Sequence, residues 1–453
     1  MADSQAYLPI QGPDDLVAMF HASEKPPAVW QIGTEAEKCG VRADGNALPF
    51  EKTDGPAAVR TVLERLAERH GWSKESEYEG GPCIALKRGR ASITLEPGAQ
   101  LEISGSPLDT LHETSLELLG HAAELRAVSD DLGIAWLGLG FHPFAKREEL
   151  PWVPKLRYAV MREYLPTRGK YALDMMLRTC TVQANLDYAN VDDAFQKLRI
   201  GLRLQPIVAA AFASAPWVEG RATGERSRRL HVWSSVDPDR QGLLPQLWEG
   251  PASYERYVEW ALDAPMFLIK RGGTLHKNTG QTFRSFLKDG FEGLVATHAD
   301  WETHVNSLFP EARLKRTLEM RGADGQKAGM LTALPAIWKG LLYEEEARRK
   351  AESLASRVAY DALEAARPDI ANHGLRAMLQ GRSLRDWVGE VIELAESGLQ
   401  RLGVLDAQGR DERIHLAPLR ALVEKGLTPA DELLAAVPSE TPDPKALIEA
   451  ARF

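Results

Sequence analysis

The chain has few cysteines, and it lacks the patterns in which cysteines stabilise small secreted domains. Its 3 cysteines, Cys39, Cys83 and Cys180, form no C-x-x-C pair, which argues against both a zinc ribbon and a disulfide framework. The sequence also has no run of about 20 apolar residues, the length that spans a bilayer, so we expect no membrane partner. The odd number of thiols favours a reducing compartment, and the acidic N-terminal segment favours the cytoplasm over a targeted location.

Several common catalytic signatures are missing as well. The sequence contains no G-x-x-x-x-G-K-[ST] phosphate loop, no H-E-x-x-H zinc motif and no G-x-S-x-G nucleophile turn. Gly138 and Gly140 form only a fragment of a dinucleotide-binding fingerprint. The 64 acidic residues outnumber the 55 basic ones, so the formal charge of -9 lacks the positive field that nucleic-acid binders use. We therefore expect no nucleic-acid partner.

The chain does contain enough apolar material for a large enzyme. Hydrophobic residues make up 44% of its 453 residues, which allows a sizeable core. Residues 1–335 mix short alternating runs with glycine and proline, whereas residues 336–453 show helical periodicity, most clearly over 383–402. Because no linker-like stretch separates these parts, we predict a single catalytic domain over 1–453, with the helical C-terminal part packed on the sheet-containing part.

Glutamates follow one face of the predicted strands near the N-terminus. Successive side chains of a strand point to opposite sides, so residues two apart share a face. Glu35 and Glu37 share a face in segment 29–38. Two further strands, joined by a Pro-Gly turn, are expected to bring Glu96 and Glu102 to the same side.

Two later segments repeat this separation of polar and apolar positions. Segment 178–187 alternates, with one face made of Thr179, Thr181, Gln183 and Asn185. Segment 314–324 is predicted to be a single strand whose polar face carries Lys315, Thr317, Glu319 and Arg321.

The acids of these strands suggest a metal site when they are taken together. For any single strand, a solvent-facing polar side is the simpler interpretation. Clustered carboxylates repel one another, however, and a hard divalent cation such as Mg²⁺ is their usual neutraliser. A floor made of Glu35, Glu37, Glu96, Glu102 and Glu319 is expected to hold two or three such ions between protein and nucleotide.

Basic residues near these strands are candidates for anion contacts. Guanidinium groups suit carboxylates and phosphates, and the candidates are Arg178, Arg226, Arg228, Arg229, Lys315, Arg316 and Arg321. A solvated loop is the alternative interpretation for the cluster 226–229. The spacing of His142, His298 and His304 does not fit a metal site, and we expect surface or packed histidines there.

The longest motifs resemble a known family. QIGTEAEKCGV, ITLEPGAQLEISGSPLDTLHET, GLGFHPF, YLPTRGKYALDMMLRTCTVQANLDY and RLKRTLEMRGAD are similar to segments of the plant-type glutamate–cysteine ligases, which also occur in proteobacteria. The resemblance implies an α+β, glutamine-synthetase-like fold. In that fold a curved antiparallel sheet has a concave active-site face, helices surround the sheet, and the C-terminal part is helical.

The resemblance also implies site residues. By similarity, the Mg²⁺ ligands would be Glu35, Glu37, Glu96, Glu102, Gln183 and Glu319. Residues near the glutamate site would be Met176, Arg178 and Thr179, and further substrate or phosphate contacts would come from Arg229, His231, Trp233, Lys315 and Arg321. Of these, Arg178, Lys315 and Arg321 are the catalytic candidates.

The implied reaction joins the γ-carboxylate of glutamate to the amine of cysteine through a γ-glutamyl phosphate, with ATP as co-substrate. This would be the first step of glutathione biosynthesis. Two alternatives stay open: a carboxylate–amine ligase of this fold that uses another amine, and a silent ligand-binding protein. We expect a monomer or a homodimer.

The cysteines depart from the plant pattern. Ser115 stands where plant members carry a regulatory cysteine, so the plant disulfide switch is expected to be absent. Cys180 lies on the face opposite Gln183, and we expect it to be a buried apolar residue rather than a nucleophile.

Overall fold

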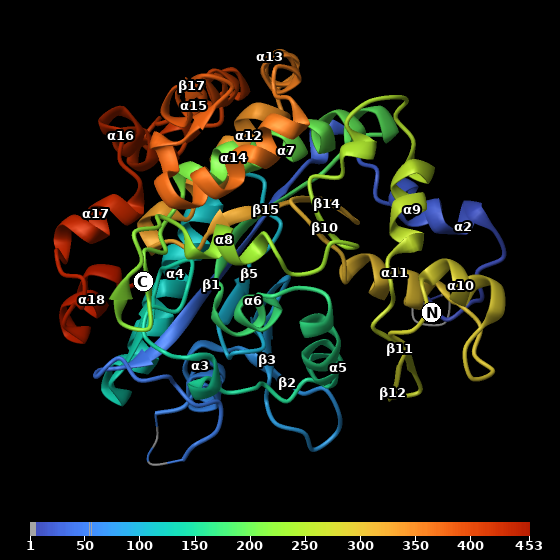
Figure 1. Ribbon diagram of the computed structural model, residues 1–453, viewed down its shortest axis with the longest axis horizontal. Coiled ribbons are helices and arrows are strands. Elements are labelled where there is room, and N and C mark those ends of the chain that lie inside the picture. The colour runs from blue at the N-terminus through green and yellow to red at the C-terminus, as the bar shows by residue number, and fades with distance from the viewer. Residues whose placement is uncertain (1–5, 54, 56) are drawn as a thin grey trace.

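The computed structural model describes residues 6–53, 55 and 57–453, and it contains one large antiparallel sheet surrounded by helices (Figure 1). Residues 1–5 of the acidic N-terminal segment lie outside this description. Within the described residues, no helix combines the length and the apolar character needed to cross a bilayer.

The sheet is built around one long central strand, β1 (Ile32–Arg42). β1 pairs with β7 on one side and with β5 on the other, and its second half also pairs with β6. Every pairing in this sheet is antiparallel. The strands run in the order β14 (Ala312–Leu314), β15 (Leu318–Asp324), β7 (Thr181–Leu186), β1, β5 (Leu101–Ser104), β4 (Ala91–Leu95), β3 (Ala85–Arg88) and β2 (Ser73–Glu75), with β6 (Ile134–Leu137) outside this path.

The two faces of the sheet differ in chemistry because apolar and polar residues alternate along its strands. Apolar residues such as Val182, Leu186 and Met320 are fully buried on one face. Three helices contact the strands there, namely α4 (Leu111–Ser129), α7 (Val191–Ala211) and α12 (Ala333–Leu342). The opposite face carries the predicted glutamates and is left for the functional site.

Two strand predictions need correction. Segment 314–324 is a tight hairpin rather than one strand, because Lys315 N–H donates to the Thr317 carbonyl at 2.9 Å and the chain reverses between β14 and β15. The run of three polar residues at 315–317 breaks the alternation, which is typical of a turn. β7 begins only at Thr181, since the preceding residues connect it to helix α6 (Ala172–Arg178).

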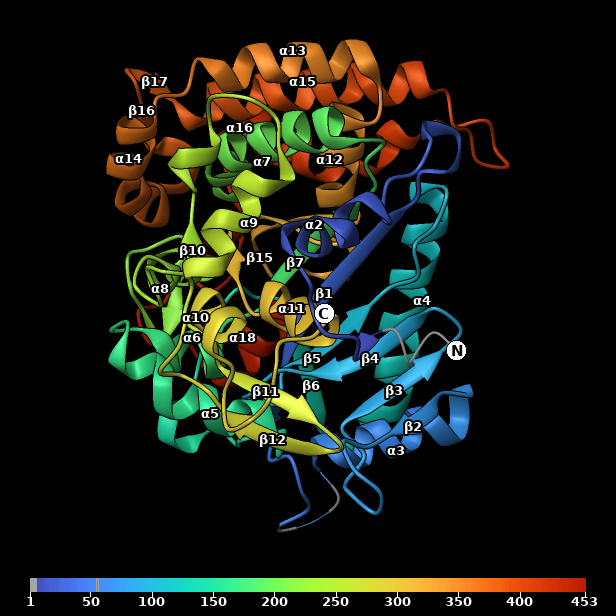
Figure 2. The same cartoon turned by 90° about the vertical axis from the view of Figure 1, so that its right-hand side faces the viewer.

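The helical C-terminal part is confirmed. Beyond α12 it consists of α13 (Glu345–Ser356), α14 (Tyr360–His373), α15 (Leu384–Leu402), α16 (Ala417–Lys425), α17 (Pro429–Ala436) and α18 (Pro444–Ala451). α17 starts as the sequence predicts, with the Thr428 side chain accepting the Asp431 N–H in a capping box. Figure 2 shows α13 and α15 at the top of the molecule, on the side away from the hairpin β11–β12.

The remaining elements flank the sheet. The helices are α2 (Pro13–His21), α3 (Val59–His70), α5 (Leu156–Tyr164), α8 (Arg228–Trp233), α9 (Tyr254–Asp263), α10 (Phe283–Asp289) and α11 (His298–Asn306). Short strand pairs are β8 (Trp217–Val218) with β9 (Arg221–Ala222), β10 (Gln241–Gly242) with β13 (Phe309–Pro310), β11 (Leu268–Arg271) with β12 (Thr274–Lys277), and β16 (Met378–Leu379) with β17 (Arg382–Ser383).

All three cysteines are free and buried. Cys180 is fully buried, as the sequence predicts, and burial raises the pKa of its thiol well above the ordinary value. A thiol in this environment is a poor nucleophile at neutral pH because it stays protonated.

Candidate active site

Strand register brings the predicted glutamates onto one part of the polar sheet face. Glu37 of β1 lies opposite Glu102 of β5, and Glu102 lies opposite Thr94 of β4. On the other side of β1, Glu35 lies opposite Gln183 of β7. The alternation in the sequence therefore predicts correctly which side chains share this face.

The turn between β4 and β5 places Glu96 beside Glu102. Ala99 N–H donates to the Glu96 carbonyl at 2.9 Å, and Ala99 itself adopts a left-handed φ of 65°. Gly98 is required at this turn, because a Cβ there would lie 2.3 Å from the carbonyl oxygen of Leu177 at the end of α6. This close packing fixes the hairpin that carries both glutamates.

Glu37, Glu96 and Glu102 form a compact group, which we call the acidic triad. One carboxylate oxygen from each lies within 4.8 Å of the others. Burial, followed by repulsion from Glu96, raises the pKa of Glu37 well above its ordinary value, and the same two causes raise the pKa of Glu102. An oxygen-only donor set with this much repulsion fits a hard divalent cation.

Hydrogen bonds orient the acids of the triad. The Thr181 N–H donates to Glu37 Oε2 at 2.8 Å, and the Ser104 hydroxyl donates to Glu102 Oε1 at 2.5 Å. The longer contact from the Thr94 hydroxyl, at 3.4 Å, also goes to Glu102 Oε1. Among the described residues, Glu37 Oε1 and Glu102 Oε2 therefore accept no hydrogen bond. The triad is thus held in place while it keeps capacity to bind a ligand.

Two further metal candidates lie next to the triad but have protein partners. Asn185 donates from Nδ2 to Glu35 Oε1 at 2.8 Å, and burial followed by the charge of Glu319 raises the pKa of Glu35. Gln183 accepts a hydrogen bond from Arg321 at 2.9 Å. Their place as metal ligands stays a prediction, although both line the same cavity as the triad.

Glu319 lies in a different electrostatic environment. It is fully buried and forms ion pairs with Arg313 at 2.7 Å, Lys315 at 2.8 Å and Arg321 at 2.7 Å. Burial alone would raise the pKa of Glu319, but these three cations hold it well below its ordinary value. Its role as a metal ligand stays a prediction and would require at least one of these pairs to open.

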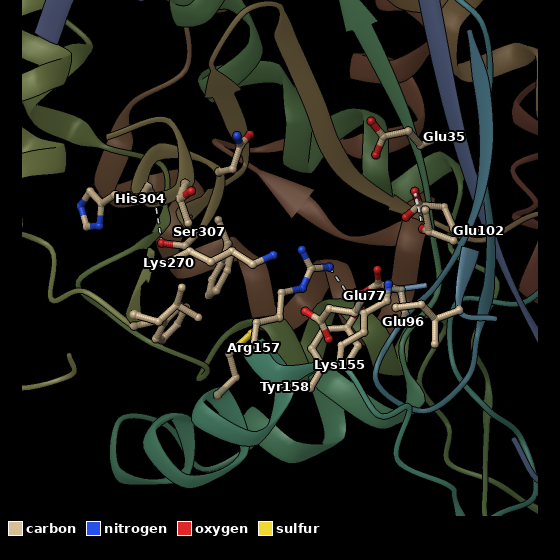
Figure 3. A pocket seen from close by; sticks show the side chains of 18 of the residues that line it. Glu35, Glu77, Glu96, Glu102, Lys155, Arg157, Tyr158, Lys270, His304 and Ser307 are labelled. Atoms are coloured by element: carbon tan, nitrogen blue, oxygen red, sulfur yellow. Dashed lines mark hydrogen bonds between the residues drawn. The ribbon is translucent and has the colours of Figure 1, made fainter. Parts of the chain in front are cut away.

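The triad faces a cavity of about 690 Å³ (Figure 3). The sheet forms one wall of this cavity. Helix α5 contributes Lys155, Arg157 and Tyr158, and the region of the β11–β12 hairpin contributes Phe267 and Lys270. An acidic wall and a basic wall therefore enclose the same space, which suits a polyanionic ligand bridged by divalent cations.

The sequence analysis missed the α5 residues. Lys155 is the N-cap of α5 and Arg157 lies in its first turn, where the helix dipole disfavours cations. No acidic residue balances them in that turn. Two bases at a helix start are a detectable signal of a functional site, because the fold places them against their local electrostatic preference.

Lys155 also ties α5 to the sheet. Its ammonium group donates to the Leu95 carbonyl at 2.7 Å, and the Tyr158 hydroxyl donates to the same carbonyl at 2.8 Å. Burial, followed by repulsion from Arg157, lowers the pKa of Lys155 to about 8. Since Leu95 directly precedes Glu96, this anchor holds one acid of the triad at a fixed distance from the bases of α5.

The candidates at the end of α6 do not line this cavity. Gln100 donates from Nε2 to the carbonyls of Met176 at 3.2 Å and Thr179 at 3.0 Å. Arg178 pairs with Asp174 at 3.1 Å and with Glu219 at 3.1 Å. The hydrogen bonds of Gln100 connect the end of α6 to the hairpin of the triad. Direct substrate contacts by Met176, Arg178 and Thr179 stay predictions.

The candidates on α8 divide between two locations. Arg229 and Trp233 line a narrow recess that adjoins the main cavity at Arg321. Arg229 donates to the carbonyls of Gly322 at 2.8 Å and Arg321 at 2.9 Å. His231 instead contacts Glu225 and Tyr171 and lines neither space, so its expected substrate contact stays a prediction that the geometry does not favour.

The chain is similar to known proteins over most of its length. Residues 31–450 match the glutamate–cysteine ligase family 2. The chain is 42% identical over 424 residues to the chloroplastic glutamate–cysteine ligase of Brassica juncea, covering 93% of this chain and 80% of that protein. The chloroplastic enzyme of Arabidopsis thaliana is 41% identical over 424 residues, covering 93% of this chain and 79% of that protein.

Solved structures share the fold. A glutamate–cysteine ligase from Francisella tularensis, solved in complex with AMP, superposes with a TM-score of 0.57 at 12% identity, covering 93% of this chain and 87% of that chain. A bifunctional glutathione synthetase from Pasteurella multocida gives a TM-score of 0.51 at 15% identity, covering 97% and 52% respectively. With the antiparallel sheet and helical C-terminal part, this likeness confirms the predicted α+β fold class.

The expected cytoplasmic location is contradicted by the relatives. The enzymes of Brassica juncea, Oryza sativa and Arabidopsis thaliana are all chloroplastic by name. The prediction failed because a compartment is specified by a sorting signal that a receptor reads, and neither the charge of a short segment nor the number of thiols carries that information.

The family match covers residues 31–450, and the relatives are about 41% identical over 93% of this chain. The matched range includes all the motifs that resemble this family. The chain belongs to the glutamate–cysteine ligase family 2.

Proposed function

We propose that this protein is an ATP-dependent glutamate–cysteine ligase that makes γ-glutamylcysteine, the first step of glutathione biosynthesis. The observation that carries the proposal is the acidic triad opposite Lys155 and Arg157 across one cavity. Family membership makes this activity the expected one, and the charges that face the cavity suit its chemistry.

Mg²⁺ is the proposed metal, with two or three ions per site. The triad would hold it, with Glu35, Gln183 and Glu319 as further candidate ligands. Bound Mg²⁺ would neutralise phosphate charge and so reduce the repulsion between two anionic reactants. The residues around it supply the remaining positive charge, from Arg157 on α5 and from Arg321 beside the triad.

The reaction has two steps in this proposal. The γ-carboxylate of glutamate attacks the γ-phosphorus of ATP, the bond to the bridging oxygen breaks, and ADP leaves. The amine of cysteine then attacks the acyl carbon, phosphate leaves with the C–O electron pair, and the amine loses a proton to solvent. Arg321 and Lys315 are held rigidly by Glu319, which suits them for stabilising charge that develops on the transferred group.

Selection of the amine is a separate property from activation of the carboxylate. The charged walls of the cavity favour activation of a carboxylate by a nucleotide, and they do not select the acceptor. A ligase of the same fold with another amine is therefore the second candidate. The full acidic triad argues against a silent binding protein, because repulsion among its acids is costly without a bound cation.

The test is phosphate release with glutamate, ATP and Mg²⁺ in the presence of a panel of amines. Cysteine or 2-aminobutyrate should give turnover well above the other amines. Glu102→Gln should lower kcat by about 100-fold or more, because it removes one charge from the metal-binding group. Glu68→Gln, on the exposed side of α3, is the matched control and should retain activity. Equal turnover with unrelated amines would favour the second candidate.

A further inference from the structure

The cations that line the cavity fall into two kinds. Arg313 and Arg321 both form ion pairs with the single carboxylate of Glu319. Among the residues that the structure describes, Lys155, Arg157 and Lys270 form no ion pair within 4.0 Å. These three, which we call the cationic wall, offer positive charge that no carboxylate of the described chain compensates at close range.

Lys270 comes from a different element than Lys155 and Arg157, which belong to the start of α5. It lies in β11, which pairs only with β12 in a separate two-stranded hairpin. Gly272 and Gly273 close the hairpin with φ values of 51° and 81°, as a two-residue turn of this kind requires. Lys270 is exposed, and its backbone partner is Leu275, which also lines the cavity.

Figure 3 shows the side chain of Lys270 extending toward the guanidinium group of Arg157. Arg157 belongs to α5 and Lys270 to the β11–β12 hairpin, and neither element carries a residue of the acidic triad. The approach of these two like charges costs free energy unless an anion lies between them. The arrangement therefore indicates a ligand with several negative charges on the side of the cavity away from the sheet.

Apolar residues lie next to these cations. Met161 lies on α5 with Arg157, Phe267 directly precedes β11, Leu268 lies on β11 with Lys270, Leu275 lies on β12, and all four line the cavity. An apolar surface beside a cluster of cations fits a flat base joined to a chain of phosphates. A single carboxylate of an amino acid would require neither the apolar surface nor three cations.

We propose that Lys270, together with Arg157, binds the phosphate chain of a nucleoside triphosphate, so that the β11–β12 hairpin is part of the nucleotide site. This inference rests on the proposed function, in which ATP occupies the cavity. It assigns to the hairpin a role in selecting the triphosphate over shorter nucleotides, because charge attraction grows with the number of phosphates.

The test compares Lys270→Met with Lys277→Met on the same hairpin. Lys277 carries the same charge but lies outside the cavity lining and forms an exposed pair with Glu163, which contributes little. Calorimetry with Mg²⁺ would measure the affinity of each variant for a non-hydrolysable ATP analogue, ADP and AMP. Lys270→Met should weaken the ATP analogue by about 10-fold, the usual size for one charged hydrogen bond, with a smaller loss for ADP and almost none for AMP.

Further outcomes keep the inference distinct from the proposed function. Lys270→Arg should restore most of the affinity, since the charge is kept. An equal loss for all three nucleotides, or a rise in KM confined to glutamate, would overturn the phosphate assignment. If the unaltered protein bound no nucleotide at all, the proposed function itself would fail, whereas normal binding by both variants would refute only the role of Lys270.

Discussion

At the scale of single residues, glutamates on one sheet face lie in two opposite electrostatic environments. The triad acids repel one another, so burial and repulsion raise the pKa values of Glu37 and Glu102. Glu319, on a neighbouring strand, is surrounded by cations that hold its pKa well below the ordinary value. All three residues are glutamates, so residue type does not explain the opposite pKa shifts. The shifts differ because the protein supplies cations to Glu319 and leaves the counter-charge of the triad to a ligand.

This difference predicts how pH affects the metal-free protein. The pKa values of Glu37 and Glu102 lie above the ordinary 4.5 in the folded state, so the folded protein keeps protons that the unfolded chain releases. The stability contributed by these groups should therefore fall as pH rises from 4.5 through their folded pKa values.

Glu102→Gln tests the prediction, because the amide is neutral at every pH. In a chelator near neutral pH, thermal melts should show a higher Tm for Glu102→Gln than for the unaltered protein. Added Mg²⁺ should raise the Tm of the unaltered protein more than that of the variant. Glu68→Gln should behave like the unaltered protein, and a lower Tm for Glu102→Gln in chelator would contradict the repulsion argument.

At the scale of elements, glycines allow two C-terminal helices to cross at short distance. A Cβ on Gly398 of α15 would lie 1.9 Å from the Gly340 carbonyl oxygen of α12. A Cβ on Gly340 would lie 2.3 Å from the Ala395 carbonyl oxygen. Both contacts are with backbone, which cannot move aside as a flexible side chain would. The contact of α12 with α15 therefore depends on the absence of side chains at these positions.

Alanine substitutions on one helix should separate packing from helix propensity. Gly398→Ala should lower the free energy of unfolding by about 1–3 kcal/mol, the usual cost of overpacking a close contact. Gly389→Ala on the same helix has no atom within 4 Å of the new Cβ, and it should raise stability by about 0.5–1 kcal/mol. Chemical denaturation measures both values. A stabilising Gly398→Ala would show that the two helices lie farther apart.

At the scale of the whole molecule, a buried ion pair joins the C-terminal helices to the sheet-containing part. Lys339 of α12 pairs with the fully buried Glu412 at 2.8 Å. Glu412 also accepts the Leu111 N–H at 2.6 Å, and Lys339 donates to the Asp109 carbonyl at 3.1 Å. These contacts join residues about 300 positions apart at the start of α4. They support the prediction of a single domain.

Glu412→Gln tests whether the two parts unfold together. The variant leaves the Lys339 charge buried without its partner, which should lower the free energy of unfolding by about 3–5 kcal/mol. Scanning calorimetry should show one cooperative transition in both proteins, shifted to lower temperature in the variant. Glu390→Gln removes more exposed pairs with Arg357 and Arg382 and should cost at most about 1 kcal/mol. Two separate transitions would contradict a single domain.

Much of the fold could be predicted from the sequence because it depends on local alternation. β1, the β4–β5 hairpin and the C-terminal helices follow from periodicity and turn residues. The hairpin of β14 and β15 does not follow from the alternation, because the polar run at 315–317 fits one continuous strand as well as a turn. The prediction of a single strand concealed Arg313, which lies opposite Glu319 across the hairpin and neutralises it.

The sequence by itself determined which residues share the polar face of the sheet, because side chains alternate along every strand whatever the surroundings. It also determined the family, through long motifs that the comparisons confirm. Only the tertiary structure decided which acids stay available and which bases face them. The Arg157 of α5 and the Lys270 of the hairpin reach the cavity through packing between distant segments, and no local pattern encodes such packing.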